Sequence, residues 1–261
     1  EPFQDELGFW RLLGWEGRKA EAVHLAESVS NRPSSAKDVI ALSRLYREWA
    51  LREQALRVFR DFSRAFNDST EFWVAYAREL IDARRWEELH QVSFQVRLQP
   101  EVRDYLSGFS YYLEGRAELG QQRHFHAEAA FARVCQREFL HPRLGLNIAE
   151  DLVLLGYLDI ARNLLRQIER PLASSAEYWS LLFHGAEKLK DSDLMLRAAQ
   201  AAYQLRPGDP ASASNYAVTL LIHRQSPQEA VRLTLSVLSR RPGSFLARIN
   251  HAAALLLNNR V

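Results

Sequence analysis

A period of about 34 residues runs through the chain and constrains its fold more than any other feature. Small or apolar residues recur at steps of 33, 34, 38, 34, 34 and 35 residues, at Ala22, Ala55, Leu89, Ala127, Ala161, Met195 and Ala230. Seven residues after each of them stands another apolar residue, namely Val29, Phe62, Val96, Val134, Ile168, Ala202 and Val237. Such a period predicts a helical repeat array, in which each repeat buries its apolar face against its neighbours. The first set is called the small column below.

The stretch "LLGYLDIARNLLRQIERP", residues 154–171, indicates the form of one repeat. One face of a helix is formed by Ala161, Leu164, Leu165 and Ile168. Gly156 can take the left-handed conformation that ends a preceding helix of roughly 143–155. Pro171 predicts the end of the second helix, because the residue before a proline resists helical geometry. The stretch is therefore the turn and second helix, helix B, of a hairpin whose first helix is helix A.

The A helices carry their own columns of apolar residues. Thirteen residues before the small column stand Phe9, Leu42, Tyr76, Ile148, Leu182 and Ala217, and nine before it stand Leu13, Tyr46, Leu80, Leu152, Ala186 and Leu221. Trp73 and Trp179 stand sixteen residues before it. Spacings of three and four residues place these side chains on one face of a helix. We expect that face to pack in the interior of the array.

This pattern resembles the tetratricopeptide repeat family, which has an aromatic residue early in helix A, a glycine-containing turn, Ala in helix B and a closing Pro. The resemblance covers about residues 3–261 and implies an all-α fold. It implies a right-handed superhelical solenoid of about seven antiparallel helix pairs plus an unpaired C-terminal helix. We expect a single domain with repeats at about 3–33, 36–68, 69–100, 101–141, 142–171, 174–207 and 209–242, and a partial repeat at 243–261.

The chain departs from the family pattern in two ways. Most repeats lack the family's glycine in helix A, and the turn is glycine only at Gly17 and Gly156. The step of 38 residues from Leu89 to Ala127 adds about one helical turn. We expect a longer helix or turn near "EGRAELGQQRHFHAEAAF", protruding from the fourth repeat.

Composition excludes several classes of protein. The formal net charge of +2 implies no strong attraction to nucleic acid or to a membrane surface. The charge is uneven, because residues 201–261 hold seven Arg against Asp209 and Glu229, a net of +5. No apolar run reaches the length of a membrane span. Thirty of the 34 basic residues are Arg, which favours a bacterial source, with cytoplasm or periplasm left open. The chain begins with Glu1 without a signal-peptide pattern, so we expect a piece of a longer protein.

No pattern in the sequence indicates an enzyme, a metal or a cofactor. The eleven glycines are scattered, so they form no phosphate-binding loop. His124 and His126 would point to different faces of a helix, and no third ligand is suitably spaced. Cys135 is the only cysteine, so the chain has no internal disulfide. We interpret it as a structural residue of helix B rather than a nucleophile. We therefore expect no catalytic residue and no cofactor.

The resemblance implies that the A helices line a groove for an extended peptide or a partner helix. By the family's geometry, groove positions lie 18, 15, 11 and 8 residues before the small column. Candidate partner-binding residues at these positions are Lys37, Arg44, Arg47, Arg78, Glu150, His184 and Asn215, with Arg85 beside them. The family's Lys and Asn clamp for a peptide carboxylate is not reproduced, which argues against a chaperone-tail adaptor.

Several interpretations of this groove remain open. Its charges either solvate the groove wall or bind an acidic or carboxylate-bearing protein partner through bidentate Arg contacts. Single-stranded RNA binding would need recurring polar residues, whereas Ile40, Val74 and Leu146 are apolar. A non-catalytic interaction module of a larger enzyme or envelope complex is the third alternative.

The segment "GSFLARINHAAALLLNNRV" predicts a last A helix without its B helix. We expect Phe245, Ile249, Ala252, Ala253 and Leu256 to pack on the seventh repeat, leaving Ala254, Leu255 and Leu257 toward the missing helix. Arrays normally end in a helix with a polar outer face, and this segment has none. The sequence thus predicts a longer native chain, or cover by another chain, including self-association through this helix.

Overall fold

The structure is a computed structural model, and it describes residues 2–29, 33–104, 106–137 and 139–259. All secondary structure in these residues is helical, and the chain divides into two compact units, Glu1–Leu140 and His141–Val261. The predicted all-α class, with seven helix pairs and one further helix, is confirmed.

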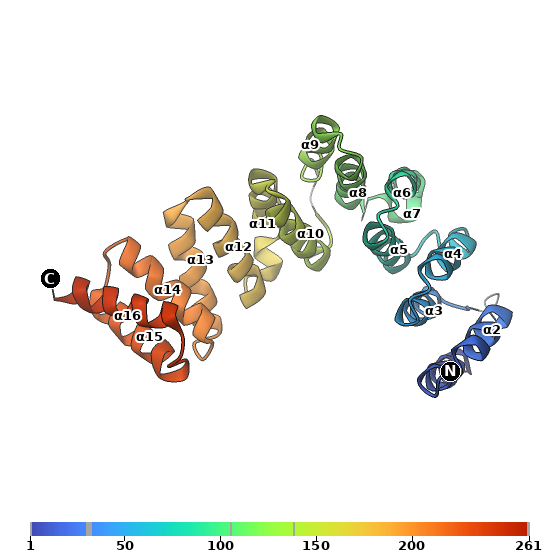
Figure 1. The fold of residues 1–261 in the computed structure, drawn as a ribbon. Coiled ribbons are helices and arrows are strands. Elements are labelled where there is room, and N and C mark those ends of the chain that lie inside the picture. The colour runs from blue at the N-terminus through green and yellow to red at the C-terminus, as the bar shows by residue number, and fades with distance from the viewer. Residues whose placement is uncertain (1, 30–32, 105, 138, 260–261) are drawn as a thin grey trace. The chain divides into compact units, whose positions relative to one another are not determined.

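Unit 1 consists of four helix pairs and one short helix (Figure 1). Its helices are α1 (Pro2–Trp15), α2 (Lys19–Val29), α3 (Ala36–Glu48), α4 (Arg52–Phe62), α5 (Thr70–Asp82), α6 (Trp86–Leu98), α7 (Pro100–Arg103), α8 (Ser107–Gly120) and α9 (His124–Ala132). The A helices α1, α3 and α5 pack side by side, and each also contacts the B helix that follows it.

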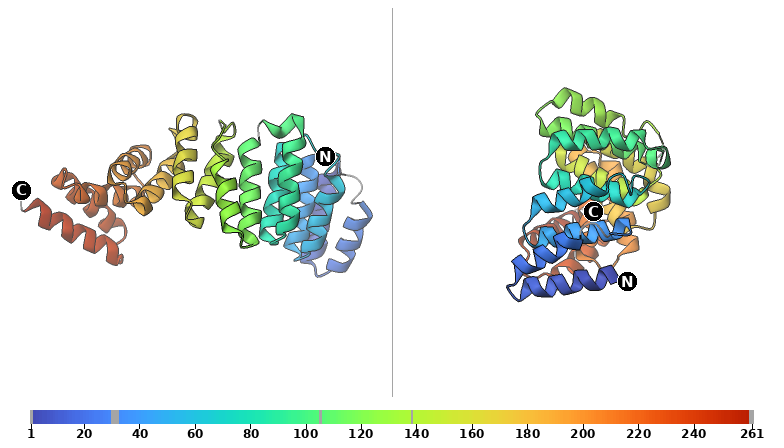
Figure 2. Two further views of the ribbon diagram at one scale, coloured as in Figure 1. Left: turned by 90° about the horizontal axis from the view of Figure 1, so that it is seen from above. Right: turned by 90° about the vertical axis from the view of Figure 1, so that its right-hand side faces the viewer.

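Unit 2 repeats this arrangement with three pairs and a final A helix (Figure 2). Its helices are α10 (Pro142–Leu155), α11 (Leu158–Leu172), α12 (Ala176–Leu189), α13 (Ser192–Leu205), α14 (Pro210–Ile222), α15 (Pro227–Arg240) and α16 (Phe245–Asn258). Helix α11 ends one residue beyond Pro171, so the proline lies in its last turn rather than after it.

The small column is buried in all seven helix pairs, as its predicted place at the helix contact requires. All seven of its residues are buried, and none is more than 7% exposed. Trp73 and Trp179, in the column sixteen residues earlier, are buried too. Their indole Nε1–H groups donate equivalent hydrogen bonds, 2.8 Å to the carbonyl of Asn67 and 2.7 Å to that of Ala173. The repeat register read from the sequence is therefore that of the folded chain.

A left-handed residue closes every A–B turn, although only two of these residues are glycine. The φ angles are 83° at Gly17, 62° at Ala50, 55° at Arg84, 62° at Gln122, 89° at Gly156, 57° at Lys190 and 51° at Arg224. A residue with a Cβ pays about 1–2 kcal/mol for this conformation. The pair packing imposes the turn at five positions where the residue itself does not favour it.

The extra turn of the fourth repeat lies elsewhere than predicted. Helix α8 begins 18 residues after Leu89, whereas α5 begins 15 residues after Ala55. Most of the inserted length is therefore in the link that contains α7, and α7 packs against α6. Val102 and Leu106 of this link are 1% and 0% exposed. The insertion contributes to the core, and the expected protrusion near residues 114–131 was wrong.

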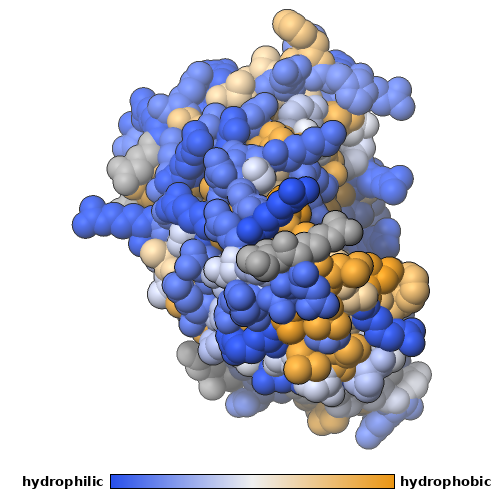
Figure 3. All heavy atoms as spheres, turned by 90° about the vertical axis from the view of Figure 1, so that its left-hand side faces the viewer, coloured by the Kyte–Doolittle hydropathy of each residue, from blue (hydrophilic) through white to orange (hydrophobic). Residues whose placement is uncertain are grey.

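Two further predictions fail at the ends of the chain. Phe9 is 54% exposed, because no helix in the described ranges covers that face of α1. In α16 the buried residues are Ala247 and Ala254, whereas Ile249 and Leu256 are 47% and 62% exposed. The predicted packing face of α16 was therefore wrong for Phe245, Ile249, Ala252, Leu256 and Ala254, whereas Leu255 is 41% exposed as predicted. Figure 3 views the molecule from the side on which α16 lies and shows an apolar area among polar side chains.

Candidate functional site

The A-helix face of unit 1 has a depression of about 780 Å³ where four of the predicted groove positions lie, Lys37, Ile40, Arg44 and Glu71. Its lining residues are Gln4, Ser35, Ala36, Lys37, Asp38, Ile40, Ala41, Arg44 and Glu71. These residues come from α1, from the N-cap and the first three turns of α3, and from the first turn of α5. Lys37 and Arg44 are exposed. Both lie three to four residues from the half-buried Ile40, so the depression combines cationic walls with an apolar floor.

The acidic Asp38 in this depression is already engaged in capping α3. Its Oδ2 accepts hydrogen bonds from the backbone N–H groups of Ser34 and Ser35, and its Oδ1 accepts one of 3.0 Å from Gln4 Nε2. Burial by itself would raise the pKa of Asp38, but these hydrogen bonds outweigh it and lower the pKa below its usual range. Asp38 therefore stays ionised and structural, and does not compete for a bound cation.

The charges of three predicted arginines act on one half-buried carboxylate, Glu79 of α5. Arg47 lies 3.0 Å from Glu79 and 3.6 Å from Asp82. Burial raises the pKa of Glu79, the charge of Arg47 opposes that rise, and the charges of Arg44 and Arg78 oppose it more weakly. The Arg47 side chain is therefore occupied by an ion pair within unit 1.

Arg44 and Arg78 remain exposed and make no side-chain hydrogen bond or ion pair with any residue in the described ranges. Arg44 lies on α3 and Arg78 on the neighbouring α5, and both act on the same carboxylate. Arg44 and Arg78 therefore lie on neighbouring A helices near one carboxylate. Sequence reasoning missed Glu79, although it follows Arg78 directly on the same helix.

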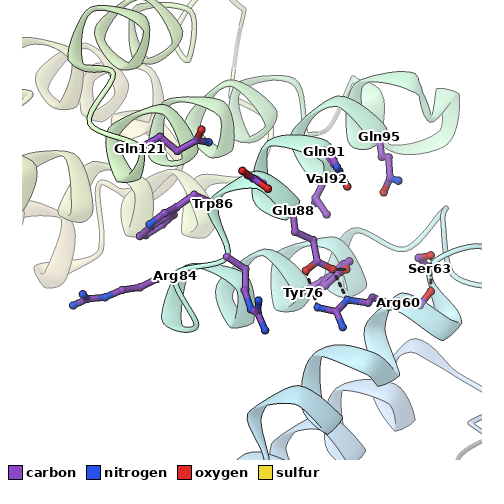
Figure 4. A pocket seen from close by; sticks show the side chains of 12 residues that line it. Arg60, Ser63, Tyr76, Arg84, Trp86, Glu88, Gln91, Val92, Gln95 and Gln121 are labelled. Atoms are coloured by element: carbon purple, nitrogen blue, oxygen red, sulfur yellow. Dashed lines mark hydrogen bonds and ion pairs between the residues drawn. The ribbon is translucent and has the colours of Figure 1, made fainter.

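Arg85 does not belong to this cluster, contrary to expectation. It precedes α6, pairs with Glu53 of α4 and lines a second depression of about 790 Å³ on the B-helix side (Figure 4).

Three side chains in that second depression link α4, α5 and α6. Glu88 accepts two hydrogen bonds from Arg60, of 2.7 and 2.8 Å, and one of 2.5 Å from the Tyr76 hydroxyl. The contact with Arg60 holds the pKa of Glu88 below its usual range, although burial opposes this and the Tyr76 hydrogen bond assists it. Because every polar group of these three side chains is paired, we interpret the three as a cross-link between repeats.

The predicted residues of unit 2 form no comparable cluster among the residues that the structure describes. Glu150 is exposed on α10, and Asn215 is half-buried on α14. His184 is exposed on α12, and its Nδ1 lies 3.7 Å from Glu187. Ser212 and Thr219, two further groove positions of the seventh repeat, are buried, so they cannot reach a partner.

Three charged side chains lie close together in unit 2, but they are not predicted groove residues apart from Arg143 and Glu177. Arg143 lies 2.7 Å from Glu177, and Arg206 lies 3.5 Å from the same carboxylate. All three side chains are more than half exposed, so their mutual attraction is screened by solvent.

Candidate catalytic and metal chemistry finds little support in the described ranges. Burial raises the pKa of Cys135 to about 11, so its thiol is protonated at neutral pH. His124 and His126 are exposed in the first turn of α9, and no group of three potential metal ligands occurs in the part of the chain that is described. In the same residues, no helix has both the length and the hydropathy needed to cross a membrane.

No protein-family model matches this sequence, and no curated protein matches it. Solved structures do share its fold. MamA of strain RS-1, an ArsTM double mutant, superimposes with a TM-score of 0.52 at 13% identity, covering 81% of this chain and 97% of that chain.

Two further structures are similar at lower scores. YrrB, a TPR protein with an unusual peptide-binding site, has a TM-score of 0.49 at 15% identity, covering 72% of this chain and 95% of that chain. A chain of the APC/C hetero-tetramer Cut9–Hcn1 has a TM-score of 0.45 at 17% identity. That match covers 94% of this chain, which spans only 48% of the other. The likeness to MamA concerns the fold alone, and the buried small column and the A–B turns agree with it. The chain is therefore a TPR-like array of helical repeats.

Proposed function

We propose that this chain is a non-catalytic protein-interaction scaffold whose unit-1 A-helix face binds an acidic segment of another protein. The observation that carries the proposal is the pair Arg44 and Arg78, which are exposed on neighbouring A helices without a side-chain partner in the described ranges. A planar guanidinium presents two parallel donors to a carboxylate, so two such groups on adjacent helices suit a segment with several acidic residues.

The surroundings of the pair favour an anion over a cation. Asp38 is committed to the α3 cap, and Glu79 and Asp82 are committed to Arg47. Lys37 adds a third cation without a partner in the described ranges, against the single exposed Glu71. The half-buried Ile40 supplies apolar contact, which suits a peptide with alternating acidic and apolar residues.

Fluorescence anisotropy of a labelled Glu- and Leu-containing peptide tests the proposal, with a Gln-for-Glu peptide as the ligand control. The double variant Arg44→Glu/Arg78→Glu should weaken binding about tenfold or more at low ionic strength, since each exposed contact is worth up to about 1 kcal/mol. Both side chains are exposed, so the far-UV circular dichroism spectrum should not change.

The matched control is Arg52→Glu/Arg64→Glu, which makes the same change in net charge on the opposite side of the repeats. Arg52 begins α4 and Arg64 follows that helix, and both are exposed. If both double variants weakened peptide binding equally, net charge alone would explain the loss of affinity, and the proposed site would be refuted. Tighter binding of single-stranded oligoadenylate than of the acidic peptide would mean that the partner is RNA rather than a protein.

A further inference from the structure

Unit 1 carries an arginine at the same place in each of its four A helices. Each of these arginines stands six residues before the left-handed residue of its A–B turn, and together they form the arginine row, Arg11, Arg44, Arg78 and Arg116. Arg116 is half-buried, whereas Arg44 and Arg78 are exposed. The corresponding residues of α10 and α12 in unit 2 are Glu150 and His184, so a common helix property does not explain the row.

The first member of the arginine row already binds a carboxylate. Arg11 donates two hydrogen bonds to Glu48 of the neighbouring α3, of 2.9 Å to Oε2 and 3.1 Å to Oε1. This is the bidentate geometry that a guanidinium makes with a carboxylate. Glu48 stands two residues before Ala50, the left-handed residue that follows α3. An arginine of this row can therefore hold a carboxylate that approaches from the side of the next repeat.

Neither Arg44 nor Arg78 has the acceptor that Arg11 has. For Arg44 the residue that matches Glu48 is Asp82, which lies 3.6 Å from Arg47 instead. For Arg78 the matching residue is Gly120, which has no side chain. Neither arginine has a side-chain partner in the described ranges. Two neighbouring carboxylate-binding positions of the row are thus left open to a partner.

The packing of α3 against α5 sets the distance between these two positions. The two helices are in contact, and the axes of helices that pack side by side lie about 8–10 Å apart. A polyproline II segment rises about 3.1 Å per residue with three residues per turn, so every third side chain lies on one face, about 9 Å from the last. Side chains on one face of a β-strand are about 6.6 Å apart. On an α-helix they are about 6 Å apart at four residues and about 10.5 Å apart at seven. Of the three, the polyproline II spacing falls within the distance between the helices.

We propose that the acidic segment bound by unit 1 is a polyproline II segment with an acidic residue at every third position. One carboxylate binds Arg44 and the next binds Arg78, each in the place that Glu48 takes at Arg11. The assignment rests on the function proposed above and adds the conformation and the residue spacing of the partner. Apolar residues, proline among them, fill the two positions between the acidic ones and contact the half-buried Ile40 beside Arg44. Proline also fixes the segment in this conformation before it binds, which lowers the entropy lost on binding.

The first test uses the full chain and two labelled proline-rich peptides of the same composition. One peptide has its two Glu residues three positions apart, and the other has them two positions apart. Fluorescence anisotropy at low ionic strength should show about fivefold tighter binding of the first peptide, because only its two carboxylates reach both arginines at once. The variant Arg44→Glu/Arg78→Glu should abolish this difference.

A second variant tests the register of the arginine row by releasing Arg11. In Glu48→Gln, Arg11 loses its carboxylate partner and becomes a third position, one repeat before Arg44. A peptide with three Glu residues, each three positions from the last, should bind this variant about three- to fivefold more tightly than the parent. The two-Glu peptide should gain no more than about twofold, because it gains only a second way to bind.

Glu128→Gln is the matched control, because it makes the same change in net charge on α9. Glu128 is exposed and has no side-chain partner among the described residues. If this control tightened binding of the three-Glu peptide as much as Glu48→Gln does, net charge would explain the gain and the arginine row would be refuted. An unchanged affinity of Glu48→Gln for the three-Glu peptide would refute it as well.

The remaining outcomes separate the spacing from the site. Equal affinity for the two spacings, with both lost in Arg44→Glu/Arg78→Glu, would overturn the polyproline II partner and leave the acidic-segment site standing. Tighter binding of a helical peptide with Glu residues seven positions apart would overturn it in favour of a partner helix. Failure of every acidic peptide to bind, or binding that the double reversal leaves unchanged, would overturn the proposed function together with its partner.

Discussion

The most direct test of the repeat register is to place a charged side chain at a small-column position. Ala161 of α11 is 1% exposed, with Leu164, Leu165 and Ile168 buried beside it. In Ala161→Arg the new side chain must either bring its guanidinium into the contact between α10 and α11 or push the helices apart. Arg is a good helix former, so intrinsic helix propensity does not account for any loss of stability.

The size of the loss follows from the burial of Ala161. Forcing extra side-chain volume into a packed contact costs about 1–3 kcal/mol. A buried charge without a partner costs several kcal/mol more, although the long side chain recovers part of this by reaching solvent. We therefore expect a loss of about 3–5 kcal/mol in the free energy of unfolding, much of the stability of a typical domain. The midpoint of thermal unfolding should fall by roughly 10–20 °C.

Urea and thermal unfolding followed by circular dichroism measure this loss, and hydrogen exchange locates it. Peptides from α10 to α12 should lose protection first, because each repeat is stabilised mainly by its neighbours. Asn163→Arg is the matched control, since Asn163 is exposed on the same helix. It should change stability by no more than about 0.5 kcal/mol.

Two results would refute this reasoning. Unfolding of Ala161→Arg at the parent's midpoint would mean that Ala161 does not lie at the helix contact. An equal loss in Asn163→Arg would mean that charge on α11, rather than burial, sets the stability. Ala55→Arg should behave like Ala161→Arg in unit 1, because Ala55 is 0% exposed in the same column.

Three further predictions concern single side chains. Glu88→Gln should cost about 1–2 kcal/mol at neutral pH after allowance for solvent exposure of the pair with Arg60. Because the folded-state pKa of Glu88 is lowered, its contribution is present above the ordinary Glu value of about 4.3 and is lost as the pH falls through the folded value. Acid titration of parent and variant should thus converge at low pH, and a constant gap would contradict the pKa shift. Ala50→Gly should stabilise by up to about 1 kcal/mol, since φ is 62° at Ala50, and a lower urea midpoint would contradict this. Cys135, with a pKa of about 11, should react with iodoacetamide at pH 8 far more slowly in the folded than in the urea-unfolded chain, and equal rates would disprove its burial.

The sequence by itself determined the helix pairs, their register and the burial of the small column. Ala55, Leu89 and Ala161 were identified from spacing alone, and all three are at most 1% exposed. This part was predictable because the period of a helix and the packing of similar repeats both require apolar residues at fixed spacings along the chain. The choice of Arg44 and Arg78 as neighbours on one surface also followed from the period, since equivalent positions of adjacent repeats lie side by side.

Only the tertiary structure decided which charges remain available and which apolar faces remain uncovered. The half-buried Glu79 forms an ion pair with Arg47 and leaves Arg44 and Arg78 without one, and the sequence does not show which of the three arginines is paired. The packed face of α16 was predicted wrongly for Ala254 and Leu256, because apolar residues on several sides of a helix give no sign of which side meets its neighbours. That choice depends on how closely two backbones approach, and the small Ala254 in the packed structure allows the approach on its side and leaves Leu256 facing solvent.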